Sequence, residues 1–155
     1  MTLEEHTLNL GKLIVNLHSL EFSLRVFLCE AHKESFLIPN IGQKSVTETH
    51  LTNYDSLGQL IGKYNEIVTS ANAQFLVDTS VVELRDAIAH GRVMSRTQNP
   101  PLRIFKFNKP NSGLVDVTYD QTMDQQWYDD SRRFVYDQNE KVRDYGKRLG
   151  FNSFS

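Results

Sequence analysis

The chain has 155 residues, of which 39% are hydrophobic and 23% are charged. These values are ordinary for a globular protein, and the length predicts a single domain over residues 1–155 that can bury a core without disulfides. The net charge of −2 argues against a protein that binds nucleic acid through its overall charge.

The residue types that usually bind metals are scattered along the chain. Cys29 is the one cysteine, which excludes an intrachain disulfide and, within one chain, a cysteine-based metal cluster. The five histidines include no pair at a ligand spacing, and His18 and His32 would lie roughly 21 Å apart along one helix. We therefore expect no metal and no cofactor. The N-terminus lacks a signal-peptide pattern and no apolar run is long enough to span a membrane, so we expect a cytoplasmic protein without membrane contact.

Residues 3–33 are predicted to form the first and longest helix, because leucines recur there at spacings of three and four. Glu21 is the unusual residue, since it lies beside this apolar stripe. Two interpretations stay open. Glu21 either forms an ion pair with Arg25, four residues later, or meets Arg85 in the core and holds its guanidinium in place.

The remaining elements follow from periodicity and from the residues that end helices. They are a connecting segment over residues 34–54, a second helix over about 56–70, a third helix from near Asn72 to Gly91, a β-hairpin over about 102–119 and a last helix from about Met123 to Leu149. Thr2 with Glu5 matches a capping box, Asp55 is the expected N-cap of the second helix, and Gly150 is expected to end the last. The pattern predicts an all-α fold with a small β-hairpin insertion before the last helix.

The most informative stretch covers residues 81–92, which read as the last turns of a buried helix with apolar residues on more than one side. It carries Arg85, Asp86 and His90 and ends at Gly91, where a left-handed backbone costs little. Three ionisable groups on a largely buried helix need a reason, because unpaired buried charge is costly.

Arg85-Asp86-x-x-x-His90 followed by Gly91 resembles the R-x(4–6)-H motif of HEPN domains, which are small helical domains and in many cases metal-independent ribonucleases and toxins. The resemblance covers residues 84–92 in motif and roughly 3–150 in architecture. It implies an all-α, HEPN-like four-helix bundle. It also implies an endoribonuclease that acts on RNA as a toxin or defence effector, leaves a 2′,3′-cyclic phosphate, pairs with an antitoxin protein, and forms a homodimer whose motifs line one cleft.

Metal-free RNA cleavage needs a group to take the 2′-OH proton, an acid for the leaving oxygen and cationic donors for the phosphate. His90 is the candidate acid/base, because histidine titrates near neutrality. Arg85 can bind the scissile phosphate bidentately. Asp86 lies four residues before His90 and can fix the tautomer of the imidazole. Arg92 and Arg96 can bind flanking phosphates.

Simpler roles exist for the same residues. His90 can interact with the dipole at the end of its helix, and Arg85 can form a salt bridge to Glu21 or Glu83. Residues 85–109 include six basic residues and one acidic residue, which form either a phosphate-binding patch or a merely solvated loop and hairpin. Arg85 and His90 also lie roughly 140° apart around an ideal helix, a difficulty that eases if two chains pair.

Two classes of function therefore stay open. One is a metal-independent endoribonuclease, and the other is a catalytically inactive HEPN-like helical module that binds a nucleotide, RNA or a protein partner. Exposure of His90 with Arg85 nearby favours the enzyme, whereas full burial of His90 favours the inactive module.

Overall fold

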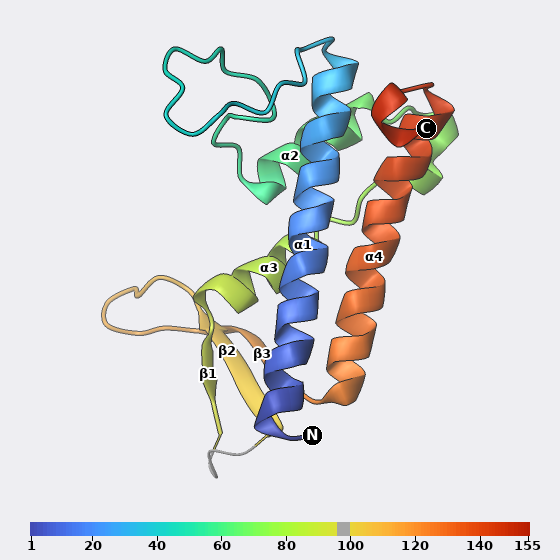
Figure 1. Cartoon of the computed structure of the whole chain (residues 1–155). Coiled ribbons are helices and arrows are strands. Elements are labelled where there is room, and N and C mark those ends of the chain that lie inside the picture. The colour runs from blue at the N-terminus through green and yellow to red at the C-terminus, as the bar shows by residue number, and fades with distance from the viewer. Residues whose placement is uncertain (96–99) are drawn as a thin grey trace. The chain divides into compact units, whose positions relative to one another are not determined.

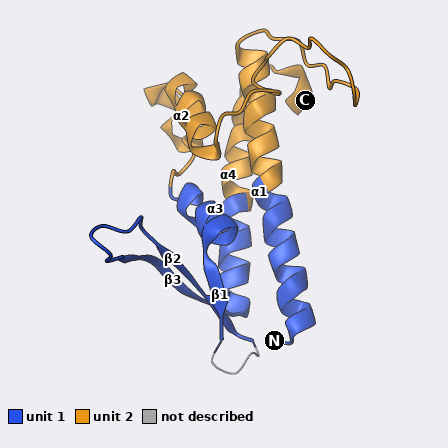
Figure 2. Ribbon diagram, turned by 90° about the vertical axis from the view of Figure 1, so that its left-hand side faces the viewer, with its two compact units in different colours: residues 1–17, 80–135 blue, residues 18–79, 136–155 orange. Residues whose placement is uncertain are grey.

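The computed structural model describes residues 1–95 and 100–155 (Figure 1). Their elements in chain order are α1 (Leu3–Ala31), α2 (Leu57–Ile67), the 3₁₀ helix η1 (Ser70–Phe75), α3 (Val81–His90), β1 (Arg92–Met94), β2 (Leu102–Phe107), β3 (Val117–Met123), α4 (Gln125–Arg148) and the 3₁₀ helix η2 (Asn152–Phe154). The chain divides into two compact units, coloured separately in Figure 2. They comprise residues 1–17 with 80–135 (unit 1) and residues 18–79 with 136–155 (unit 2).

The fold is mixed, so the expectation of an all-α, HEPN-like four-helix bundle is wrong. In unit 1 the three strands form an antiparallel sheet in the order β1-β2-β3. The predicted hairpin is present as β2 and β3, and β1 adds a strand by pairing Arg92 with Phe105 and Met94 with Arg103. Three residues are too few to show an alternating pattern, which is why periodicity did not reveal this strand. That residues 1–155 form one domain stays a prediction.

Capping boxes begin the first two helices. In α1 the Glu5 amide donates to Thr2 Oγ1 at 3.1 Å and the Thr2 amide donates to Glu5 Oε2 at 2.7 Å, as predicted. In α2 the N-cap is Ser56 rather than Asp55. Ser56 Oγ accepts from the Gln59 amide at 3.3 Å, and Gln59 Oε1 accepts from the Ser56 amide at 2.8 Å. Ser56 is the cap because it alone has a glutamine three residues later to complete the reciprocal pair.

The third helix is shorter than predicted. η1 occupies residues 70–75, and α3 begins only at Val81. Between them the side chain of Asn65 binds both backbone groups of Val77: Nδ2 donates to the Val77 carbonyl and Oδ1 accepts from the Val77 amide, each at 2.9 Å. These bonds hold the Val77 backbone to a side chain and so compete with helix formation.

In unit 1, α3 packs on β2. Ile104 of β2 is 1% exposed and lies on the covered face of the sheet. α3 contributes Val81, Leu84 and Ala87, which are buried, whereas Ala89 is exposed. The helix therefore buries one face, and the expectation of burial on more than one side is wrong.

The N-terminal parts of α1 and α4 meet in unit 1 through a buried polar pair. The side chain of His6 is 5% exposed, and its Nδ1 lies 3.1 Å from the hydroxyl of the fully buried Tyr128. Burial lowers the pKa of His6 and raises the pKa of Tyr128 to about 12. Both side chains are therefore held in their neutral forms.

Unit 2 has an aromatic core. Phe27 of α1 lies against four other rings, which are Tyr64, Tyr145, Phe151 and Phe154. α4 ends as predicted at Gly150, whose φ of 75° is left-handed. The Phe151 amide then donates to the Gly146 carbonyl at 3.0 Å and the Gly150 amide to the Lys147 carbonyl at 2.9 Å, which is the Schellman pattern.

Among the helices of the described residues, none combines the length and the apolar character needed to cross a membrane.

Candidate active site at the end of helix α3

The three motif residues lie on α3, away from the face that this helix buries. Arg85 and Asp86 are partly exposed, with 42% and 33% of their side chains open to solvent, and His90 is exposed. The expectation that these ionisable groups sit on a largely buried helix is therefore wrong. Because the surface solvates them, no burial penalty has to be offset by a ligand.

Asp86 is the centre of a small ion-pair cluster. Its Oδ1 accepts from Arg85 Nη1 at 3.1 Å, and its Oδ2 lies 3.5 Å from Lys106 Nζ on β2. Lys106 was not among the predicted site residues. It follows Ile104 by two positions and so shares the covered face of β2, which brings it to α3. Within residues 1–95 and 100–155, no hydrogen bond joins Asp86 to His90.

His90 is the last residue of α3, and its imidazole forms no hydrogen bond or ion pair with any described residue. The next residue, Gly91, has φ −69° and ψ 161°, so the left-handed backbone that we expected is absent. Gly91 is needed for a different reason. A Cβ atom there would lie 2.3 Å from the Ala87 carbonyl oxygen and 2.9 Å from Ile104 Cγ1. The chain can turn from helix into strand at this point because glycine lets the helix end press against β2.

Arg92 begins β1 two residues after His90, so the two Cα atoms lie at most about 7 Å apart. The Arg92 guanidinium carbon lies 5.2 Å from the ring centroid of Phe107. Among the described residues it has no acidic partner. Arg96, the other predicted phosphate ligand, falls outside the described residues.

The regular helix keeps Arg85 and His90 apart. α3 is helical through His90, so the two side chains leave the helix axis roughly 140° apart. Asp86 and His90, four positions apart, share a side of the helix. Arg92 lies two positions from His90 along the chain, and its guanidinium lies over the Phe107 ring.

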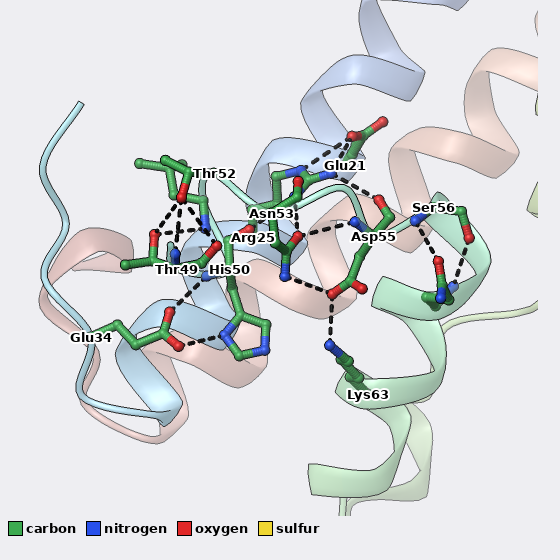
Figure 3. A network of polar contacts seen from close by, with 12 residues as sticks. Glu21, Arg25, Glu34, Thr49, His50, Thr52, Asn53, Asp55, Ser56 and Lys63 are labelled. Carbon is green, nitrogen blue, oxygen red and sulfur yellow. Dashed lines mark hydrogen bonds and ion pairs between the residues drawn. The ribbon is translucent and has the colours of Figure 1, made fainter. Parts of the chain in front are cut away.

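Glu21, the predicted supporting residue, belongs to a polar network in unit 2 that is centred on Arg25 (Figure 3). Glu21 Oε1 lies 3.0 Å from Arg25 Nη2, so the ion pair between neighbouring turns is the interpretation that the structure shows. Arg25 also donates to three backbone carbonyls of the connecting segment, those of His50, Asn53 and Asp55. Its side chain is only 13% exposed, and these contacts use its donors within unit 2.

The same network ties down the segment that connects α1 to α2 (Figure 3). Glu34 accepts from the His50 amide at 2.7 Å and lies 2.9 Å from His50 Nδ1. Burial disfavours the Glu34 carboxylate, yet these bonds to His50 hold its pKa below the ordinary value. A hydrogen bond from Lys63 likewise lowers the pKa of Asp55. Structural pairing explains both shifts, so the network is an anchor for the loop. In the part of the chain that the structure describes, no group of three or more His, Cys, Asp or Glu residues is placed to hold a metal ion.

Comparisons with protein-family models, with curated proteins and with solved structures find no match to this chain.

Proposed function

We propose that this protein is a metal-independent endoribonuclease of the HEPN type, with His90 as its acid/base. The observation that carries the proposal is the exposure of His90 at the end of α3, unpaired among the described residues and followed two positions later by the cation of Arg92. A histidine held only for packing would be buried or bonded. This one is open to a ligand, and an arginine, a residue that can bind phosphate, follows it two positions later.

The residues divide the chemistry between them. A neutral His90 takes the proton of a ribose 2′-OH, whose oxygen attacks the neighbouring phosphorus. The bond to the 5′-oxygen breaks, and the products are a 2′,3′-cyclic phosphate and a 5′-OH end. Arg85 engages Asp86 through Nη1, and its remaining N–H donors suit the phosphate. Asp86 holds the Arg85 guanidinium in position, and Lys106 pairs with the other oxygen of Asp86.

The proposal includes a homodimer with a composite site. The leaving oxygen needs a proton donor, and one chain supplies one motif histidine. The angle between Arg85 and His90 on a regular helix also disfavours a site made by one chain. Two chains that pair at the ends of their α3 helices would bring Arg85 of one chain to His90 of the other and would supply a second imidazole.

The first experiment compares the parent protein with His90→Ala on a mixed RNA pool in EDTA. We expect cleavage by the parent, with cyclic-phosphate ends, and a loss of about 100- to 10,000-fold in the variant. His18→Ala is the matched control, because His18 is an exposed histidine on α1. Equal cleavage by the parent and His90→Ala, with both folded by circular dichroism, would refute the assignment of His90.

The composite site has its own test. His90→Ala and Arg85→Ala chains are each expected to be inactive. When they are coexpressed, mixed dimers keep one site with an intact Arg85 from one chain and an intact His90 from the other. Activity rises above that of either variant but stays below that of the parent, because the second imidazole is missing. If the mixture stays as inactive as either variant while mixed dimers form, the two residues act within one chain.

We place the enzyme in the cytoplasm as a toxin or defence effector that an antitoxin protein restrains, on the strength of the motif resemblance. Induced expression of the parent, but not of His90→Ala, is expected to arrest bacterial growth.

The second candidate is an inactive module that binds RNA, a nucleotide or a protein. The ion pairs of Asp86 with Arg85 and Lys106 favour it, because they satisfy these charges without a ligand. It predicts binding without cleavage by either the parent or His90→Ala.

A further inference from the structure

The sheet of unit 1 has a second face, which the ribonuclease chemistry does not use. Successive residues of a strand point to opposite faces. Ile104 marks the covered face, so Arg103, Phe105 and Phe107 point the other way. Residues directly opposite each other in antiparallel strands share a face, which adds Arg92 and Met94 of β1, while Asp120 and Thr122 of β3 lie on the same side. We call the five residues Arg92, Met94, Arg103, Phe105 and Phe107 the outer face.

The outer face combines aromatic rings with cations. Phe105 and Phe107 are partly exposed, and each has a guanidinium above its ring. The Arg103 carbon lies 4.7 Å from the Phe105 centroid, and the Arg92 carbon lies 5.2 Å from the Phe107 centroid. Aromatic side chains on an open strand, interleaved with arginines, are the arrangement on which unpaired bases stack.

The two sides of the outer face differ in charge, with carboxylates near β3 and a cation on β1. Arg103 is paired with Asp120 of β3 through a hydrogen bond of 2.7 Å from Nε. Beside them lies an open pocket of about 580 Å³, lined by Trp127 and by three aspartates, which are Asp120, Asp124 and Asp130. These carboxylates repel phosphate. At the β1 side, Arg92 faces no acidic partner among the described residues. A polyanion would therefore place its phosphates along β1, the side that leads back to His90.

The spacing of the two rings favours single-stranded over double-stranded nucleic acid. Phe105 and Phe107 are two positions apart, or about 6.6 Å along a strand. Stacked nucleotides rise about 3.4 Å each. Two successive bases can cover both rings only if they are splayed apart, which an unpaired strand permits and a duplex does not.

We propose that the outer face is the substrate-binding platform of this protein and that it takes single-stranded RNA. Two successive bases stack on Phe105 and Phe107, and Arg92 binds the phosphate that lies towards His90. This inference rests on the proposed function and names its substrate class. The alternative, in which the arginines only shield the rings from water, predicts no dependence of RNA binding on either phenylalanine.

The test measures binding of the full chain to a fluorescent 12-nucleotide RNA of mixed sequence with 2′-O-methyl groups, by anisotropy in EDTA. The methyl groups block attack by the 2′-oxygen, so binding is observed without cleavage. Phe105→Leu and Phe107→Leu keep an apolar side chain but remove the ring, and each is expected to weaken binding about tenfold. Arg92→Gln is expected to weaken binding and to reduce the slope of log K against log salt by about 0.7. Arg143→Gln, an exposed arginine on α4, serves as the control with unchanged affinity.

The outcomes separate the two proposals. Binding of the single strand by the parent, weakened in both leucine variants and much weaker for a duplex of the same sequence, supports the platform. Equal affinity of the parent and the folded leucine variants overturns it, as does a parent that binds no RNA or binds duplex equally well. A parent that binds the single strand on this face but leaves unmodified RNA intact would refute the nuclease and retain the platform.

Discussion

Gly91→Ala is the sharpest structural test of how α3 is joined to the sheet. The new Cβ would lie 2.3 Å from the Ala87 carbonyl oxygen, 2.9 Å from Ile104 Cγ1 and 3.1 Å from the Phe105 carbonyl oxygen. Two of these atoms are backbone, and the Ala87 oxygen also accepts the Gly91 amide at 2.7 Å. The helix end must therefore move off β2 to admit one methyl group.

The size of the effect follows from two opposing contributions. Overpacking of this kind costs about 1–3 kcal/mol, or more where backbone has to shift. Alanine gains about 0.4–1 kcal/mol from the reduced freedom of the unfolded chain, because φ −69° at this position suits an L-residue. We expect Gly91→Ala to lose about 2 kcal/mol of unfolding free energy.

The assay is urea denaturation followed by circular dichroism, with Gly11→Ala as the matched control. Gly11 also lies in unit 1, within α1, and a Cβ there meets no atom within 4 Å. Alanine at this helical position is expected to raise stability by about 0.5–1 kcal/mol. The two glycines should thus shift the urea midpoint in opposite directions. A Gly91→Ala protein as stable as the parent would refute the close approach of α3 to β2.

Two further predictions concern buried polar groups. His6 has a pKa lowered by burial from 6.5, so the unfolded chain binds a proton at a higher pH than the folded chain does. Stability should be constant above about pH 6.5 and fall as the pH drops below it, and His6→Gln should flatten that fall in urea titrations at pH 7.5 and 5.5. Equal pH dependence of the two proteins would contradict the burial of His6 beside Tyr128. Arg25→Ala removes charged donors from three carbonyls and is expected to cost about 2–3 kcal/mol and to speed hydrogen exchange over residues 48–55, whereas the exposed Arg143→Ala should cost under about 0.5 kcal/mol. Unchanged exchange in Arg25→Ala would show that the loop is held by other contacts.

The sequence predicted best where a pattern was long or where a backbone signal was local. The repeating leucines indicated α1, and the left-handed glycine at 150 ended α4 where expected. The hairpin followed from alternation around a turn. The prediction from sequence failed where the deciding contact was distant in the chain or where the element was short. The Asn65 side chain that forms hydrogen bonds with the Val77 backbone lies twelve positions away, and no helical pattern reveals these bonds.

The motif shows the same contrast between what local sequence predicts and what depends on distant contacts. Arg85, Asp86 and His90 were identified from spacing, but whether the helix around them was buried depended on which of its sides met the sheet. The outer face was missed because it depends on strand register, which places Arg92 of a three-residue strand opposite Phe105. A glycine is needed at position 91, but for close packing and not for the left-handed backbone that we expected. Both requirements select glycine, so the sequence alone does not distinguish them.

One geometric fact links the candidate catalytic residue to the candidate binding face. His90 is the last residue of α3, and Gly91 lets the end of that helix lie against β2. Arg92 is the first residue of β1, and its guanidinium covers the Phe107 ring. A substrate phosphate on Arg92 would therefore lie within about two residues of His90 without any change of fold. Arg85 has no such path to His90 along a regular helix, and in the proposed function it acts on the His90 of a second chain. Variants of Arg92 and Arg85 should consequently differ: the first should impair binding by each chain alone, and the second should impair cleavage in a way that an intact partner chain restores.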